Sequence, residues 1–367
     1  MTAKPALRAV GDNPTPIWGM ANAERVRRIA SAQKLDGEGG GVLLANLRYA
    51  FDPVWTSHLA GRPDTVVTRA GVPVLAHLAD PSYAGAVEHA MLADAPLGRT
   101  RLAVVEAEDP AGVYNQALRK RERPFAERLA PDTVRRIERL SYDGAYKGVT
   151  DLLTKYLWPG WAFALTRVAA RLGVTPNQVT ALGTLLCVAA AVAFWFGWFW
   201  TGMATGLGFM VLDTVDGKLA RCTITSSAIG NVWDHGVDLV HPPFWWWAWA
   251  VGCAPFGRPL DDRTFWWVMG TMLFGYVAQR LIEGVFIRRF GFHIHVWERF
   301  DSRFRLVTAR RNPNMVVLFA ALLVGRPDIG IVAVAGWTVI SLVVHLVRLL
   351  QAFGQRSRGR VLESWLA

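Results

Sequence analysis

Hydrophobic and charged positions divide the chain into two unlike parts. Up to about residue 150, charged side chains recur throughout and apolar runs are short. Farther along, long stretches lack Asp, Glu, Lys and Arg altogether; they lie between Arg171 and Asp213 and at 239–257, 264–279, 312–325 and 329–347. Because a helix needs roughly 20 apolar residues to cross a bilayer, these stretches predict about six transmembrane helices.

The sequence ahead of the first stretch predicts how the chain reaches the membrane. Residues 161–172 combine the apolar spacing of an amphipathic helix with basic Arg167 and Arg171, and this pattern is typical of a helix lying in the interface. Pro176 is expected to end that helix. The first three spans are then expected at about 179–199, 202–221 and 229–251.

Aromatic and basic residues predict the orientation. Since Trp favours the membrane interface, two tryptophan clusters should mark one interface; they are Trp195, Trp198 and Trp200, and Trp245, Trp246, Trp247 and Trp249. Basic residues are concentrated between the fourth and fifth spans and in the tail 356–367. The positive-inside rule places these segments, and both termini, in the cytoplasm. The start of the chain has no apolar core of signal-peptide length, so we expect a multi-pass protein of a bacterial inner membrane.

Residues 1–142 predict a cytoplasmic α/β domain, followed by an all-α membrane domain at 143–355. Apolar runs near 42–47, 65–68, 72–76 and 102–105 predict strands, and 84–93 and 116–140 predict helices. Glycines at 37 and 39–41 invite comparison with a phosphate-binding loop, but such a loop follows a strand and opens a helix. These glycines precede the first apolar run, so a linker is the better interpretation.

Composition agrees with a membrane protein, since 52% of the residues are hydrophobic and the mean hydropathy is +0.22. The formal net charge of +11 is compatible with nucleic acid, an anionic membrane surface or an anionic substrate. In a membrane protein the last two are favoured, and we expect membrane lipids rather than nucleic acid as partners. Cys187, Cys222 and Cys253 are too scattered for a disulfide framework or a zinc site.

Four aspartates lie at the junction of the second and third spans. Asp213 and Asp216 are three residues apart and Asp234 and Asp238 four apart, so each pair projects from one helix face. Isolated buried carboxylates each cost several kcal/mol in desolvation, so cations must be present. Oxygen ligands favour Mg²⁺, with Mn²⁺ or Ca²⁺ as alternatives. The competing interpretation pairs the carboxylates with Lys218 and Arg221, or places them at a solvated helix end.

Around these aspartates the sequence resembles the CDP-alcohol phosphotransferases, whose signature is D-x-x-D-G-x-x-A-R, about eight residues, then G-x-x-x-D-x-x-x-D. Every fixed position is occupied, by Asp213, Asp216, Gly217, Ala220, Arg221, Gly230, Asp234 and Asp238. The resemblance covers about 145–350 and the count of six helices. It implies transfer of a phosphoalcohol group from a CDP-alcohol to a hydroxyl acceptor, with release of CMP, in phospholipid or inositol-phosphate-type lipid synthesis.

The resemblance also implies roles for individual residues. Two Mg²⁺ ions would be held by Asp213, Asp216 and Asp234, while Asp238 would act as the base and could touch a metal. Nucleotide-binding candidates are Gly217, Ala220, Arg221 and Gly230, with Asn177 and Thr180 as weaker ones that could instead cap a helix. Acceptor or phosphate candidates are Arg280, Arg310 and Arg311, whose alternative is a positive-inside loop.

The signature assigns no role to three histidines or to the N-terminal domain, and two rival functions compete with the one that it implies. His235 is expected to pack rather than to bind metal, and His293 and His295 lack a third ligand spaced with them. An intramembrane Mg²⁺-dependent prenyltransferase and a divalent-cation transporter are the rival functions. Prenyltransferase aspartate motifs lack the Gly, Ala and Arg positions that are filled in this sequence. Against the transporter, the fixed cations Lys218 and Arg221 beside the site would repel the transported ion. Some family members carry a nucleotidyltransferase domain at the position of this N-terminal domain. The N-terminal domain is therefore expected to be either a degenerate relative of that domain or an unrelated regulatory module. A homodimer stays open.

Overall fold

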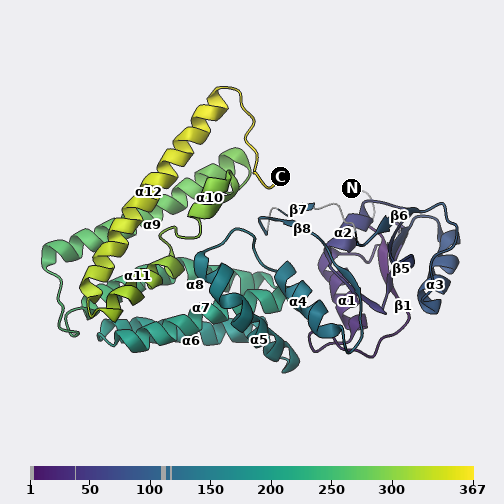
Figure 1. Cartoon of the computed structure of the whole chain (residues 1–367), viewed down its shortest axis with the longest axis horizontal. Coiled ribbons are helices and arrows are strands. Elements are labelled where there is room, and N and C mark those ends of the chain that lie inside the picture. Colours follow the sequence, from purple (N-terminus) through teal and green to yellow (C-terminus); the bar gives the residue numbers. More distant parts are fainter. Residues whose placement is uncertain (1–3, 38, 109–112, 116–117) are drawn as a thin grey trace.

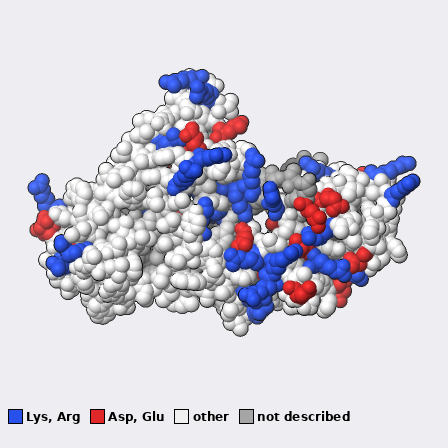
Figure 2. All heavy atoms as spheres, in the orientation of Figure 1, with Lys and Arg blue, Asp and Glu red and all other residues white. Residues whose placement is uncertain are grey.

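The computed structural model describes residues 4–37, 39–108, 113–115 and 118–367 of the chain (Figure 1). An α/β domain built from the N-terminal part lies beside an elongated domain of long helices. Lys and Arg side chains gather where the two domains meet, whereas the face of the helical domain seen in Figure 2 is largely without charge.

A mixed five-stranded sheet forms the core of the α/β domain. Its order is β1 (Ala6–Val10), β2 (Val42–Asn46), β5 (Val72–Leu78), β4 (Thr65–Arg69) and β6 (Ala103–Glu106). β1 runs parallel to β2 and β4 parallel to β6, while β5 is antiparallel to both of its neighbours. Strands and a helix were predicted at 42–47, 65–68, 72–76, 102–105 and 84–93, and the structure confirms all five.

Alternation along the strands determines which helix covers which face. Leu43 and Ala45 of β2 belong to a core cluster with α1 (Asn22–Gln33) and α2 (Val54–Ala60), whereas Leu44 belongs to a cluster with α3 (Ala84–Ala93). Successive side chains of a strand point to opposite faces, so one buried strand serves both layers. The 3₁₀ turn η1 (Pro81–Tyr83) precedes α3.

The helix predicted at 116–140 is wrong. The described part of this segment holds β8 (Lys120–Glu122), which pairs with β7 (Val113–Asn115), and β9 (Ala126–Arg128), which pairs with β3 (Tyr49–Phe51). The helix α4 (Val134–Gly144) begins only later. Pro124 and Pro131 explain the error, because proline lacks the N–H group that a helix interior requires. The glycines at 37 and 39–41 lie between α1 and β2, as a linker should.

The remaining chain is helical. After the π-helical turn η2 (Leu153–Leu157) it forms α5 (Trp158–Arg171), α6 (Pro176–Trp195), α7 (Phe199–Cys222), α8 (Ala228–Gly252), α9 (Asp262–Phe290), the turn η3 (Ile294–Val296), α10 (Arg299–Phe304), α11 (Arg311–Leu323) and α12 (Pro327–Ser357). α5 exposes Trp161, Leu165 and Val168 along one side, at the spacing of a helix face. α5 ends at Arg171, before Pro176, and Pro176 is the first residue of α6, which Thr175 caps in a capping box with Gln178.

The predicted spans correspond to α6, α7, α8, α9, α11 and α12. Among the described residues, α6 and α12 are long and apolar enough to cross a membrane by length and composition. α11 has only 13 residues, about 20 Å at 1.5 Å per residue, whereas the hydrocarbon core is about 30 Å thick.

One tryptophan cluster departs from the prediction. Trp195, Trp198 and Trp200 are exposed, as interfacial residues should be, but Trp245, Trp246 and Trp249 are buried. The indole N–H of Trp245 donates to the Cys187 carbonyl and that of Trp249 to the Pro327 carbonyl. The rings of Trp245 and Trp249 fill the bundle, because the indole nitrogen of each has a hydrogen-bond partner inside it. The three cysteines are free and buried, as predicted.

Buried polar contacts fix the α/β domain to the helical domain. Glu138 of α4, 1% exposed, accepts from Arg167 of α5 at 2.6 Å and from the Trp18 backbone N–H at 3.0 Å. Lys218 of α7 donates to the Ala145 carbonyl at 3.0 Å. The loop after α4 is therefore held against the end of α7, where the aspartates lie.

Candidate active site

Two helices that meet at the same end of the bundle carry the aspartates. Asp213 and Asp216 lie in the last part of α7, and Asp234 and Asp238 lie in the first part of α8. Ser227 caps α8 by accepting from the Gly230 N–H at 3.0 Å. The α7–α8 turn thereby brings the end of one helix beside the start of the next.

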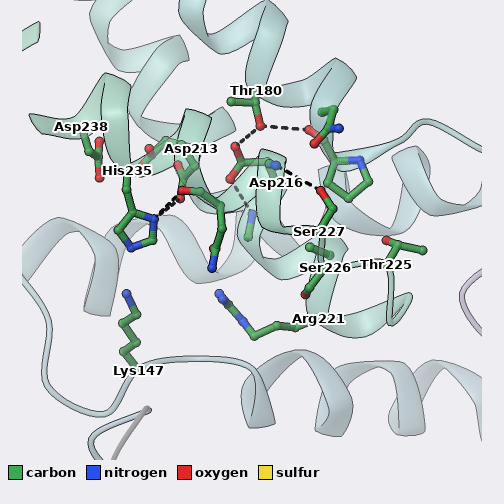
Figure 3. Close-up of a pocket in the computed structure, with 17 residues that line it drawn as sticks. Lys147, Thr180, Asp213, Asp216, Arg221, Thr225, Ser226, Ser227, His235 and Asp238 are labelled. Carbon is green, nitrogen blue, oxygen red and sulfur yellow. Dashed lines mark hydrogen bonds and ion pairs between the residues drawn. The ribbon is translucent and has the colours of Figure 1, made fainter. Parts of the chain in front are cut away.

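A cavity of about 170 Å³ opens between these ends and the start of α6 (Figure 3). All predicted metal and nucleotide residues line it, namely Asn177, Thr180, Asp213, Asp216, Gly217, Ala220, Arg221, Gly230, Asp234 and Asp238. Pro176 and His235 also line it, although His235 was expected to pack elsewhere. Sequence reasoning missed five further lining residues: Lys147, Thr225, Ser226, Ser227 and Asn231. Ser227 and Asn231 lie close to the signature glycine Gly230 in the sequence, so their positions in the site could have been inferred. No sequence pattern near Lys147 indicated that residue.

Three of the four carboxylates form a compact group. Oxygens of Asp213, Asp234 and Asp238 lie within 4.8 Å of one another. Asp216 is turned toward α6, where its carboxylate accepts from the Thr180 hydroxyl at 2.6 Å and from the Gly217 N–H. A compact set of carboxylate oxygens has the donor chemistry and spacing that a hard divalent cation such as Mg²⁺ requires.

Arg311 is the counter-ion of this group. Its guanidinium donates to Asp213 and to Asp238, each at 2.6 Å. The competing interpretation, in which Lys218 pairs with the carboxylates, is wrong, because Lys218 donates to the Ala145 carbonyl and its ammonium lies 3.4 Å from the centre of the Tyr146 ring. Arg311 was predicted to bind the acceptor or a phosphate. In the structure it bonds to two of the aspartates, since α11 starts beside α7 and α8.

Small residues allow α6 to approach the cavity. A Cβ added to Gly230 would lie 2.6 Å from Asn177 Oδ1, and one added to Gly217 would lie 3.2 Å from the Arg221 guanidinium. The capping alternative for Asn177 and Thr180 is wrong, because Thr175 provides the cap. Both residues instead face the cavity, and Thr180 bonds to Asp216.

A second cavity, of about 430 Å³, adjoins the first and is strongly basic. It contains all three predicted acceptor residues among its cationic side chains, which are Arg119, Lys147, Arg280, Arg305, Arg310 and Arg311. Glu283 pairs with Arg310 and lies 3.7 Å from Arg280. Burial, reinforced by the neighbouring Arg310, lowers the pKa of Arg305 to about 9. Six cations against the three carboxylates Asp151, Asp238 and Glu283 give this cavity an excess of positive charge, which favours an anionic ligand.

The histidines differ from the prediction in part. His235 is 70% exposed rather than packed, and its Nδ1 lies 3.7 Å from Asp234. His295 lies in a group with Glu283 and His345 whose spacing suits a metal ion, so its potential co-ligands come from α9 and α12 rather than from nearby sequence. The Arg310 guanidinium contacts both Glu283 and His295 Nε2. The sequence argument against a metal there, the lack of a third ligand, does not hold for the folded chain.

Comparison with known proteins agrees with this site. Residues 173–346 match the CDP-alcohol phosphatidyltransferase family, so this part of the chain is similar to the domain of that family.

Among curated relatives, cholinephosphotransferase 1 of Gallus gallus is 33% identical over 127 residues, 32% of this chain and 36% of the relative. The Homo sapiens protein of the same name is 32% identical over 147 residues, 37% of this chain and 34% of the relative. Archaetidylinositol phosphate synthase of Pyrococcus horikoshii is 26% identical over 188 residues, 51% of this chain and 87% of the relative. The chain thus spans about a third of the length of these cholinephosphotransferases.

Proposed function

We propose that this chain is an integral membrane enzyme that transfers a phosphoalcohol group from a CDP-alcohol to a hydroxyl acceptor and releases CMP. The observation that carries the proposal is the single cavity lined by every signature residue, which adjoins a second, basic cavity at Asp238. Two adjoining cavities provide separate room for a nucleotide donor and for an acceptor.

The residues of the first cavity have distinct proposed roles. Asp213, Asp216 and Asp234 hold two Mg²⁺ ions, with Mn²⁺ as the alternative, and Arg221 pairs with donor phosphate oxygens. When bound, the metal pair neutralises the diphosphate and the charge that develops on departing CMP. Asp238 accepts the proton of the acceptor hydroxyl, whose oxygen forms a bond to the β-phosphorus. The bond from that phosphorus to the bridging oxygen breaks, and CMP leaves with the electron pair.

The second cavity indicates the class of acceptor. Arg280 and Arg310 face it, and Arg310 is only partly neutralised because it shares Glu283 with Arg280. An acceptor that carries its own anionic group would supply the missing negative charge. This favours phospholipid or inositol-phosphate-type polar lipid synthesis. The name of the Pyrococcus relative, archaetidylinositol phosphate synthase, points the same way.

The positions of the helices support a proposal for how the chain lies in the membrane. We place α6, α7, α8, α9, α11 and α12 in the bilayer, α5 in the interface, and both termini in the cytoplasm of a bacterial cell. The α/β domain then covers the cytoplasmic ends of α7 and α8, next to both cavities. We propose a regulatory or degenerate nucleotidyltransferase-like role for it.

The test supplies purified protein with Mg²⁺ and a panel of CDP-alcohols and hydroxyl acceptors, with and without an anionic group, and detects CMP. CMP release that needs both an acceptor and a divalent cation would support the proposal. No release with any pair, or release that persists in excess chelator, would overturn it. A prenyl diphosphate included in the panel tests the prenyltransferase alternative. Cation flux into liposomes tests the transporter alternative.

A further inference from the structure

The two cavities share three residues: Lys147, His235 and Asp238. In an in-line displacement the attacking and leaving oxygens lie on opposite sides of the phosphorus. If the nucleotide occupies one cavity and the acceptor the other, the transferred phosphorus lies where the cavities join. Among the described residues, Lys147 is the only Lys or Arg that lines both cavities.

Lys147 has a firmly held backbone and an unengaged side chain. On one side of it, the Ala145 carbonyl accepts from Lys218, and on the other the Gly148 N–H donates to the Leu118 carbonyl at 2.8 Å. A Cβ on Gly148 would lie 2.6 Å from the Arg119 carbonyl, so the β7–β8 hairpin packs closely against this loop. Figure 3 shows the Lys147 side chain extending toward the aspartates. Within the described chain its ammonium makes no hydrogen bond or ion pair.

The electrostatic surroundings leave Lys147 in need of an anion. Burial, with Arg119 and Arg221 as the next causes, lowers the pKa of Lys147, and Asp234 and Asp238 only partly oppose this. An anionic group bound beside the ammonium would relieve that destabilisation. The loop that carries Lys147 precedes the matched domain at 173–346, so this cation is a contribution of the N-terminal part of the chain.

We propose that Lys147 is a catalytic residue that binds the non-bridging oxygens of the phosphoryl group during its transfer between the two cavities. The inference rests on the proposed function. As the new bond from the acceptor oxygen forms and the bond to CMP breaks, the ammonium stays beside the same phosphorus and stabilises its charge. The acceptor proton passes to Asp238, and Lys147 neither gains nor loses one.

The test compares Lys147→Ala and Lys147→Arg with Lys155→Ala, a matched control in η2 that lines neither cavity. Loss of one preorganised donor to a transition state typically lowers kcat about 10²- to 10³-fold. We expect that loss in Lys147→Ala, with CDP-alcohol affinity by calorimetry within about threefold of wild type, since the effect is confined to the transition state. Lys147→Arg should recover part of kcat, and Lys155→Ala should behave as wild type.

Each other outcome has a separate meaning. Wild-type kcat in Lys147→Ala, or an affinity loss with unchanged kcat, would overturn the role in transfer. A wild-type protein that releases no CMP would instead contradict the proposed function. Thermal melting of each variant checks folding, and Lys147→Met, which retains most of the side-chain length, replaces the alanine variant if that one is unstable.

Discussion

At the scale of single residues, the aspartate group and Arg311 form one interacting unit. Three carboxylates lie within 4.8 Å of one another, and a guanidinium bonds to two of them. Removing one partner from such a group leaves a partly buried charge uncompensated, since the side chains of Arg311 and Asp213 are 15% and 16% exposed. The identity of each carboxylate therefore affects both ligand binding and the local fold.

Asp213→Ala and Asp234→Ala should each abolish CMP release, because each removes one oxygen ligand from the compact group, and Asp216→Ala should do the same. Calorimetry with Mg²⁺ should show weakened metal binding in all three variants. Asp262→Ala, at an exposed position in the first turn of α9, is the control and should retain both properties. Full CMP release by any of the three variants would contradict the metal assignment.

Asp238→Asn should bind CDP-alcohol nearly normally and yet turn over slowly. An amide oxygen can still accept from Arg311, so the local geometry is retained, but an amide does not take up a proton at neutral pH. Loss of a general base typically lowers the rate about 10²- to 10⁴-fold. Affinity by calorimetry and CMP release are measured on one preparation. A parallel collapse of both would make Asp238 chiefly a metal ligand.

At the scale of elements, α8 illustrates how the site is supported. Pro242 and Pro243 lie inside this helix, where proline cannot donate to the carbonyl four residues earlier. The Tyr276 hydroxyl of α9 donates to the Leu239 carbonyl at 2.9 Å and replaces the bond that Pro243 lacks. The turn directly after Asp238 is thus held from a neighbouring helix.

Gly230→Ala should weaken CDP-alcohol binding, because the new methyl group would lie 2.6 Å from Asn177 Oδ1 and force α6 and α8 apart. Overpacking of this kind costs about 1–3 kcal/mol, or roughly 5- to 150-fold in affinity. Gly236→Ala lies in the same helix with nothing within 4 Å of the added Cβ. It should bind normally, and equal affinity in the two variants would show that close approach at Gly230 is unimportant.

Local pattern predicted the elements better than their surroundings. The sheet strands were recognisable because a strand buried on both faces is a short apolar run, and the aspartate faces followed from helical spacing. The segment 116–140 was predicted wrongly because its described part pairs with other strands, β3 and β7, and contains Pro124 and Pro131. Lys147, and the pairing of Arg311 with the aspartates, were beyond such reasoning, since the tertiary packing of the loop after α4 and of α11 places them in the site. For the same reason the buried tryptophans of α8 looked interfacial.

At the scale of the whole molecule, the α/β domain is joined to the helices by polar contacts and by a shared apolar core cluster. Glu138 accepts from Arg167 and from the Trp18 N–H, and Arg28 donates to the Thr223 carbonyl at 3.0 Å. The same junction carries the loop of Lys147, so its integrity matters for the site as well as for stability.

Glu138→Ala should lower the melting temperature in detergent, because it leaves Arg167 and the Trp18 N–H without their shared acceptor. Breaking a buried pair costs about 3–5 kcal/mol. The control is Asp143→Ala, which removes a 51% exposed partner of Arg139 in the same helix and should change stability by less than about 1 kcal/mol. Indistinguishable melting of the two variants would mean that the junction adds little to stability.

The shortness of α11 has a consequence for the surrounding lipid. A 13-residue helix beside the 31-residue α12 presents the bilayer with an uneven hydrophobic thickness, and lipid must thin locally to match the shorter one. That deformation lowers the headgroup plane on the side where α11 begins, at the basic cavity. A lipid substrate then reaches the aspartates with less displacement of its headgroup. Reconstitution into bilayers of increasing acyl-chain length should therefore slow turnover progressively, while the affinity for a water-soluble nucleotide stays constant.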